Sequence, residues 1–161
     1  MSRTESTVGL ISDTHGLLRP EALTILTGAD YIIHAGDIGD ANILERLSAI
    51  APVTAVRGNN DKGAWASRIP ETEVLKVGAA IIYVLHDVSA LDLDPAAVGI
   101  HAVIAGHSHR PSIESRGRVL FINPGSAGPR RFKLPVSVGW LTVSGTSIRP
   151  RLVELTVGSN A

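Results

Sequence analysis

The sequence predicts an α/β protein built as a four-layer αββα sandwich, in which two mixed β-sheets pack face to face and helices cover their outer surfaces. The N-terminal half alternates short apolar runs with helical segments, an order typical of parallel strands covered by helices. The C-terminal half consists of apolar runs separated by glycine-containing turns, which favours antiparallel hairpins. With 161 residues, 44% of them hydrophobic, and no linker, the chain is expected to form one domain over residues 1–161, with a flexible tail at residues 1–6.

Three strands and two helices are expected in the N-terminal half. The strands are predicted at residues 8–12, 31–35 and 53–56, because each run is apolar and stops at a polar or glycine-containing group. A helix is predicted at residues 20–26, which begin with Pro20, a residue that suits the first helical turn. A second helix is predicted at residues 41–50, which carry apolar side chains at helical spacing and follow Asp40 as an N-cap.

The C-terminal half is expected to form three hairpins and one separate strand. Each hairpin has a glycine between its two apolar runs, a position that suits a tight turn. The expected strand pairs are 73–77 with 80–85, 112–115 with 118–122, and 136–143 with 147–155, and the separate strand covers residues 102–105. These segments predict an antiparallel C-terminal part beside a parallel N-terminal part.

The composition excludes several classes of function. The chain has no cysteine, so thiolate zinc sites, iron–sulfur clusters and a cysteine nucleophile are excluded. Its formal net charge is zero and its aromatic content is 4%, which gives no reason to expect a nucleic-acid-binding surface. The longest apolar run, residues 77–85, is too short to cross a membrane. These features predict a soluble cytoplasmic protein.

Polar side chains that can bind metal follow five of the expected strands. Because ligands bind outside the carboxyl ends of strands in open α/β sheets, these side chains are expected to lie close together. The set comprises Asp13, His15, Asp37, Asn59, His86, His107 and His109. Carboxylate, amide and imidazole ligands without thiolate suit transition metals such as Mn or Fe better than Ca or Mg. Seven ligands are too many for one such ion but suit a pair that shares a carboxylate, the arrangement used in phosphate-ester hydrolysis.

These residues strongly resemble the calcineurin-like metallophosphoesterase superfamily. The matching motifs occur in the family's order and are Asp13-x-His15, Gly36-Asp37, Gly58-Asn59, His86 and Gly106-His107-x-His109. A later segment, Asn123-Pro124-Gly125-Ser126, is similar to the small single-domain branch of YfcE-type phosphodiesterases. The resemblance therefore covers most of the chain, and it implies the four-layer sandwich fold.

The resemblance also implies how the ligands divide between two ions. One ion would be held by Asp13, His15, Asp37 and His109, and the other by Asp37, Asn59, His86 and His107, with Asp37 as the bridge. Manganese is the expected metal, with iron, zinc, nickel or cobalt as alternatives. A hydroxide bridging the metals would attack phosphorus, so that Asp37, Asn59 and His86 act in catalysis through the metals. Glycines before the ligands would allow tight turns that orient them.

Further residues near these motifs have less certain roles. His34 is either a packed core histidine or a residue that supports the ligands from behind, and Asp61 either supports the site or forms a turn. Arg130 is a candidate to contact substrate phosphate beside Asn59. Many relatives carry a histidine where this chain has Asn60, and asparagine cannot act as an acid near neutral pH. No dedicated acid is therefore identified.

The leading interpretation is a metal-dependent phosphodiesterase acting on a small-molecule phosphoester. The rival interpretation is a weakly catalytic or non-catalytic interaction scaffold, because the small subunit of the retromer sorting complex resembles the same branch. A phosphomonoesterase or nucleotidase is a further alternative that differs only in its substrate. Relatives often form dimers or tetramers, so a homodimer or homotetramer is also an expectation.

Overall fold

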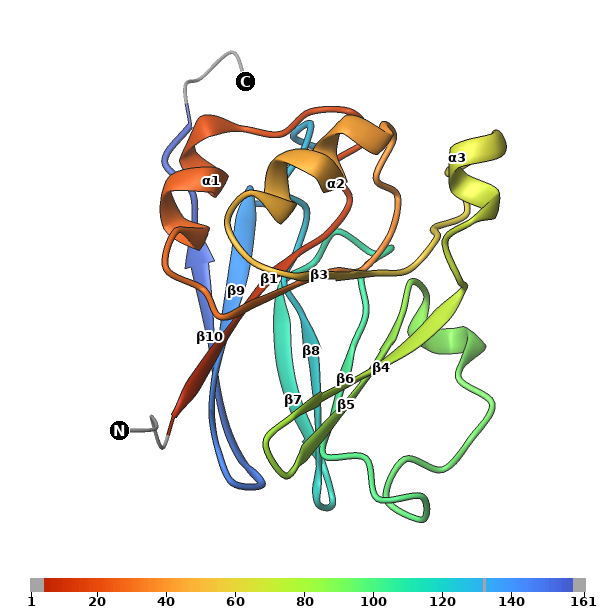
Figure 1. The fold of residues 1–161 in the computed structure, drawn as a ribbon, viewed down its shortest axis with the longest axis vertical. Helices are drawn as coiled ribbons and strands as arrows, with labels where there is room; N and C mark the ends of the chain where they lie inside the picture. The colour runs from red at the N-terminus through yellow and green to blue at the C-terminus, as the bar shows by residue number, and fades with distance from the viewer. Residues whose placement is uncertain (1–4, 132, 158–161) are drawn as a thin grey trace.

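The computed structural model describes residues 5–131 and 133–157, and these contain ten strands, three α-helices and one 3₁₀ helix. In chain order the elements are β1 (Ser6–Ile11), α1 (Pro20–Leu26), β2 (Tyr31–His34), α2 (Ala41–Ser48), β3 (Val53–Ala55), α3 (Ala64–Ser67), β4 (Thr72–Val77), β5 (Ala80–Leu85), η1 (Val88–Ala90), β6 (Ala102–Ile104), β7 (Ser112–Arg116), β8 (Val119–Asn123), β9 (Ser137–Ser144) and β10 (Ser147–Glu154). Figure 1 shows their arrangement.

The strands form two mixed five-stranded sheets. The first has the order β10-β9-β1-β2-β3, and the second has the order β4-β5-β6-β8-β7. In the first sheet β1, β2 and β3 run parallel, while β9 pairs antiparallel with both β1 and β10. The three expected hairpins are present as β4–β5, β7–β8 and β9–β10. Strands from both halves of the sequence therefore pair within the first sheet.

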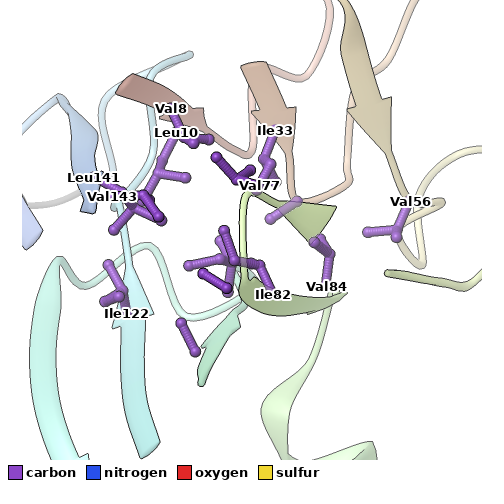
Figure 2. Packing of buried hydrophobic residues seen from close by; sticks show 14 residues of the cluster. Val8, Leu10, Ile33, Val56, Val77, Ile82, Val84, Ile122, Leu141 and Val143 are labelled. Carbon is purple, nitrogen blue, oxygen red and sulfur yellow. The ribbon is translucent and has the colours of Figure 1, made fainter. Parts of the chain in front are cut away.

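The two sheets pack through a continuous apolar core. Leu10 of β1, Ile33 of β2 and Leu141 of β9 face the second sheet, where they meet Ile82 of β5 and Ile122 of β8 (Figure 2). All five side chains are at most 3% exposed. Since each buried aliphatic side chain contributes about 1.5–3 kcal/mol, this layer fixes the two sheets against each other. The ends of the strands are thereby held at fixed positions.

Helices cover only one of the two outer faces. Leu26 of α1 and Leu47 of α2 are fully buried in a cluster with Ile32 of β2. Figure 1 shows α1 and α2 over the face of the first sheet that is turned away from the second. On the second sheet, the outer cluster around Tyr83 and Phe121 is joined by Leu91 and Leu93 from the segment after η1. The predicted sandwich of two mixed sheets is confirmed, with a loop and one 3₁₀ turn in place of an α-helical layer on this side.

The structure corrects two predictions about the secondary structure and adds two short elements. The strands β5, β6 and β8 run parallel, so the C-terminal half is mixed and not antiparallel. The prediction was wrong because β5 and β6 are joined by a long crossover that has no helical periodicity. The pattern of apolar runs therefore did not indicate that these two strands are parallel. Ser6 pairs with Val143 in β1, so the first strand includes a residue expected in the tail, and residues 1–4 of that tail lie outside the described residues. The short elements α3 and η1 were not predicted.

Other predictions about local structure agree with the structure. The first helix covers Pro20–Leu26, with proline at its start. Asp40 caps α2 by accepting a hydrogen bond of 2.9 Å from the amide of Asn42. Within the described residues, no helix is long and apolar enough to cross a membrane.

Candidate metal centre

The loops that follow the strands are joined by backbone hydrogen bonds. The amide of Asp13 donates to the carbonyl of Gly36 at 2.9 Å, and the amide of His15 donates to the carbonyl of Asp37 at 2.9 Å. These bonds continue the pairing of β1 and β2 beyond the strands themselves. In the second sheet, the amide of Gly106 donates to the carbonyl of His86 at 2.9 Å. Sequence segments far apart in the chain therefore meet at one edge of the sandwich.

Two buried carboxylates lie at the centre of this edge. Asp13 Oδ1 is 3.4 Å from His109 Nε2, 3.8 Å from His15 Nε2 and 3.9 Å from His86 Nε2. Asp37 Oδ2 is 3.3 Å from His86 Nε2 and 3.7 Å from His15 Nε2. Three imidazoles thus direct nitrogen atoms at two carboxylate oxygens.

These five side chains form two overlapping groups whose geometry suits metal binding. One group contains Asp13, His15 and His109, and the other contains Asp13, Asp37 and His86. Within each group the ligand atoms all lie within 4.8 Å of one another. Asp13 belongs to both groups, whereas the resemblance implied that Asp37 is the shared carboxylate. Asp13 and Asp37 each lie within 3.9 Å of at least two of the three imidazoles, so each carboxylate is placed beside side chains of both groups.

Three buried polar atoms of this centre lack a hydrogen-bond partner among the described residues. Among the described residues, the buried side-chain atoms without a hydrogen bond are Asp13 Oδ1, His86 Nε2 and His109 Nδ1. His86 Nδ1 lies 2.7 Å from the carbonyl oxygen of Ala35, which can only accept, so Nδ1 carries the proton. The other nitrogen, Nε2, then has a free lone pair directed at the carboxylates. A backbone carbonyl that fixes the tautomer in this way is typical of a metal-binding histidine, and the donor set fits a divalent cation.

The electrostatics of the centre also favour a cation. Burial alone would raise the pKa of Asp37, but the His86 imidazole and the Asn60 amide hold it well below its usual range. Burial opposes protonation of His86, yet its contacts with Asp37, the Ala35 carbonyl and Asp13 outweigh burial and raise its pKa. Burial lowers the pKa of His109. The ionised carboxylates therefore attract a proton to His86, and a bound divalent ion would compete with that proton.

The ligand backbone is unusual. In the described part of the chain, the non-glycine residues with positive φ are Asp13, His15, Asp37, His107 and His109, with φ between 47° and 71°. This left-handed region costs L-residues roughly 1–2 kcal/mol each, although Asp and His tolerate it better than most. Every one of these residues belongs to the predicted ligand set. Clustered backbone strain of this kind is typical of functional sites.

Two glycines serve a different purpose from the one predicted. A Cβ atom on Gly58 would overlap the backbone amide and carboxylate of Asp37, and one on Gly106 would overlap the Ser12 hydroxyl and approach the Asp13 carboxylate at 2.5 Å. Neither glycine has a positive φ. The tight-turn explanation is therefore wrong for these two positions, because glycine is needed there for close approach. For Gly36 it holds, since its φ is 101°.

Two predicted ligands lie at the rim. The His107 side chain is 45% exposed, its Nε2 is 3.7 Å from Asp87 Oδ2, and its ring centroid is 5.1 Å from that of His86. Asn59 is exposed and lines a cavity together with His86 and His107. The structure therefore brings five predicted ligands together in the two groups and leaves Asn59 and His107 beside them.

Asn60 contacts the centre in a way that the sequence did not reveal. Its side-chain amide donates to Asp37 Oδ2 at 3.0 Å, and its backbone amide donates to Asp37 Oδ1 at 2.9 Å. The residue at the position of the family's histidine thus holds the central carboxylate in place. Nothing in a single sequence signals this contact.

Arg130 and Arg131 lie in the same loop near the centre. Arg130 is exposed, and no hydrogen bond or ion pair joins it to the centre within the described residues. The next residue, Arg131, is near enough that its charge contributes to lowering the pKa of His109, after the larger effect of burial. Arg131 is therefore the arginine of this loop with an electrostatic effect on the predicted ligands.

His34 links the loops behind the ligands. Its Nδ1 accepts a hydrogen bond of 3.1 Å from the Gly36 amide, so its Nε2 carries the proton and donates to the Thr14 hydroxyl at 3.0 Å. The Thr14 hydroxyl in turn donates to the carbonyl of Ile38 at 2.8 Å. His34 is fully buried, and its hydrogen bonds among the described residues go to the Thr14 hydroxyl and the Gly36 amide. It fixes the loops that follow β1 and β2, and Thr14, which the sequence pattern did not single out, shares this role.

Replacing His34 by glutamine is expected to weaken the acid sensitivity of the metal-free protein. Burial lowers the pKa of His34 from 6.5 to about 3. Between pH 6.5 and about pH 3, the unfolded chain therefore binds a proton at this histidine that the folded chain does not bind. As the pH is lowered through this range, the free energy of unfolding decreases by at most ~1.4 kcal/mol per pH unit. Denaturant titrations of chelator-treated wild type and His34→Gln at pH 7 and pH 5 measure this difference. Equal changes in both proteins would contradict the assignment.

Asp61 anchors two loops through three backbone amides. Its Oδ2 accepts from the amides of Ile38 at 3.1 Å and Gly58 at 2.9 Å, and its Oδ1 accepts from the amide of Gly39 at 2.9 Å. The side chain is buried. It therefore connects the backbone directly after Asp37 with the backbone before Asn59.

The fold and this arrangement of carboxylates and imidazoles define a metallophosphoesterase. The profile of the calcineurin-like phosphoesterase superfamily domain matches residues 7–146. The chain therefore belongs to this superfamily, and the predicted family is confirmed. The family implies divalent metal ions as cofactors and a hydrolase acting on phosphoesters.

Three similar proteins illustrate the range of the superfamily. A probable metallophosphoesterase of Methanocaldococcus jannaschii is 36% identical over 132 residues, which cover 74% of this chain and 67% of that protein. The phosphodiesterase YfcE of Escherichia coli is 27% identical over 160 residues, covering 81% and 84% of the two chains. The structure of vacuolar protein sorting 29 from Cryptosporidium parvum has a TM-score of 0.80 at 20% identity, covering 94% and 92%, and shows likeness of fold alone.

Proposed function

We propose that this protein is a phosphodiesterase that uses two divalent metal ions. The observation that carries the proposal is the convergence of Asp13 and Asp37 with three imidazole nitrogens, among which buried donor atoms have no partner in the described protein. Buried polar atoms that lack a partner cost about 1–3 kcal/mol each, and a bound cation would offset that cost. The preference for diesters is supported by the similarity to the phosphodiesterase YfcE.

Each ion would be held by residues from both sheets. Asp13, His15 and His109 would hold one ion, and Asp37 and His86 would hold the other, with Asn59 and His107 reaching it from the rim. Asp37 is 3.7 Å from His15 and 3.3 Å from His86, so it would contact both ions. When bound, the ions would polarise the phosphoryl oxygens and acidify an attacking water.

The protein's own groups would orient these parts. The two amide hydrogen bonds from Asn60 fix the rotamer of Asp37, and the Ala35 carbonyl fixes the tautomer of His86. The Asn60 side chain cannot release a proton near neutral pH, so it cannot protonate a leaving alkoxide. The enzyme is therefore expected to favour esters whose alcohols are good leaving groups, such as aryl phosphodiesters.

Metal loading provides the test. The purified, chelator-treated protein is expected to bind about two Mn²⁺ ions per chain, to gain thermal stability from them, and to become active on bis(p-nitrophenyl) phosphate. Elemental analysis, thermal unfolding and a panel of Mn²⁺, Fe²⁺, Zn²⁺, Ni²⁺ and Co²⁺ measure this. Binding of no ion after loading would overturn the proposal. Faster hydrolysis of p-nitrophenyl phosphate than of the diester would favour a monoesterase.

The second candidate function is that of an interaction scaffold on the same fold. It is favoured by the hydrogen bonds of Asn60, which occupy both oxygens of Asp37 with protein donors. The similarity in fold to vacuolar protein sorting 29 is compatible with it. An Asn60→Ala variant separates the two: a scaffold gains no hydrolytic activity from it, whereas an enzyme changes its rate because Asp37 loses its support.

A further inference from the structure

We propose that the catalytic edge carries two separate subsites of unequal size for the two ester groups of a phosphodiester. The substrate would join one ring-sized alcohol to one compact, neutral and polar alcohol through phosphate. This inference deepens the proposed function and rests on it. It follows from two cavities that border the same histidine, His107, and share only Asp87 besides it among their lining residues.

The larger cavity has a volume of about 350 Å³ and lies against the ligands Asn59, His86 and His107. Its apolar lining comes from the buried side chains of Tyr83 and Leu85 on β5. The volume lies in the range of about 300–1,000 Å³ found for small-molecule sites. At about 30 Å³ for each water-sized group, it holds about a dozen non-hydrogen atoms, which is one substituted ring.

The charged side chains around the larger cavity disfavour an anionic ester group. Arg57 is part of its lining, and its guanidinium is 2.8 Å from the carboxylate of Glu71. Asp87 and Asp92 add negative charge to the same lining. The cavity therefore suits an aromatic or sugar-like ring better than a charged group.

The smaller cavity has a volume of about 150 Å³, enough for about five non-hydrogen atoms by the same measure. Val103, Ala105 and Phe121 form an apolar wall, and Ser108 and Ser112 supply hydroxyls. Ser108 Oγ accepts a hydrogen bond of 3.1 Å from the Asn123 amide, so its own proton remains available to donate. A compact alcohol with hydroxyl groups, of the size of glycerol, matches this lining.

An ion pair forms part of the lining of the smaller cavity. The Arg116 guanidinium lies 4.2 Å from the centroid of the Phe121 ring, and its Nε is 3.2 Å from Glu114 Oε1. Both residues line the cavity, and their opposite charges offset each other. Asp87 is the remaining charged residue of the lining, so the subsite suits an uncharged alcohol better than an anionic group.

Asp87 and His107 are the two residues that line both cavities. Asp87 lines both, and its Oδ1 accepts hydrogen bonds from the amide of Ser89 at 3.0 Å and from its hydroxyl at 2.8 Å. These bonds hold the Asp87 side chain in place as a divider next to His107. The two ester oxygens of a phosphodiester diverge from phosphorus, so their groups would lie on either side of this divider. A monoester would fill only one subsite and would gain binding energy from only one.

Two tryptophan variants test the subsites separately. Ala90→Trp is designed to fill the larger cavity and Ser112→Trp the smaller one, and neither residue belongs to the metal centre. The substrates are p-nitrophenyl phosphate and its glyceryl and phenyl diesters. The wild type is expected to have a KM about tenfold lower for the glyceryl than for the phenyl diester. Ser112→Trp is expected to raise KM about tenfold for the glyceryl diester and to change KM for the monoester by less than about twofold. Ala90→Trp is expected to raise KM for the glyceryl diester and for the monoester.

Ser115→Trp is the matched control, because Ser115 is exposed on the same strand, β7, and does not line either cavity. It is expected to change no KM. Equal effects of Ser112→Trp on monoester and diester, or no effect on either, would overturn the two-subsite proposal, as would equal KM values of the wild type for the two diesters.

Calorimetric binding of glycerol phosphate and phenyl phosphate to the metal-loaded protein separates this proposal from the proposed function. The subsites predict that Ser112→Trp weakens only glycerol phosphate and that Ala90→Trp weakens only phenyl phosphate, each about tenfold. If this pattern appears without turnover of any ester, the proposed function fails and the subsites stand. If turnover occurs without the pattern, the subsites fail and the proposed function stands.

Discussion

Asp37→Ala is expected to lower kcat/KM for an aryl phosphodiester by at least ~100-fold and to reduce the number of bound metal ions. Changes to groups that merely support a metal ligand typically cost 10–100-fold, and Asp37 itself faces both His15 and His86. Removing it also leaves the Asn60 amide without its acceptor. Metal content and steady-state rates at saturating Mn²⁺ measure the two effects.

Asp40→Ala is the matched control for this variant. Asp40 lies three residues further along the same loop, but its carboxylate only caps α2. The variant is expected to lose about 1 kcal/mol of stability and to keep its metal and its activity. Equal rates for wild type and Asp37→Ala would show that the metal centre is not the site of catalysis.

Asp61→Ala is expected to have the largest effect on stability among the variants considered. It leaves the amides of Ile38, Gly39 and Gly58 without their acceptor. Ile38 and Gly58 are buried, and an unsatisfied buried donor costs about 1–3 kcal/mol. Allowing for partial access of water, the free energy of unfolding should fall by about 3 kcal/mol or more. Because these amides position the loop of Asp37, Mn²⁺ affinity should also fall by about 10–100-fold.

Two further variants make this expectation specific. Asp61→Asn keeps the shape of the side chain but directs an NH₂ group at backbone donors. Its free energy of unfolding is therefore expected to lie between those of Asp61→Ala and wild type. Asp94→Ala removes an exposed carboxylate and should change stability by less than about 0.5 kcal/mol. Urea titrations and metal titrations measure both quantities, and a change below 1 kcal/mol for Asp61→Ala would contradict the anchoring role.

Much of the centre was predictable because each ligand follows a strand. Asp13, His15 and Asp37 come directly after apolar runs, and parallel strands bring their carboxyl ends to one edge. The hairpins were predictable for a similar reason, since local glycine turns determine their pairing. Such features depend on neighbouring residues in the sequence.

The remaining features depend on contacts between distant residues. The hydrogen bonds of Asn60 to Asp37 span 23 positions, and those between Thr14 and His34 span 20. The parallel direction of β5 and β6 is determined by a crossover that has no helical pattern. The exposure of Asn59 and His107 likewise depends on how the loops pack, which residue type does not indicate. No local pattern encodes these contacts.

The left-handed backbone of the ligands places stability and function in opposition. Glycine at Asp13 or His109 would relieve a strained conformation, yet it would delete a predicted ligand. Metal-free conditions therefore favour sequences that lose the site, and only bound metal offsets the strain. A laboratory selection for heat resistance carried out without metal would erode the ligands first, whereas the same selection with Mn²⁺ present would retain them.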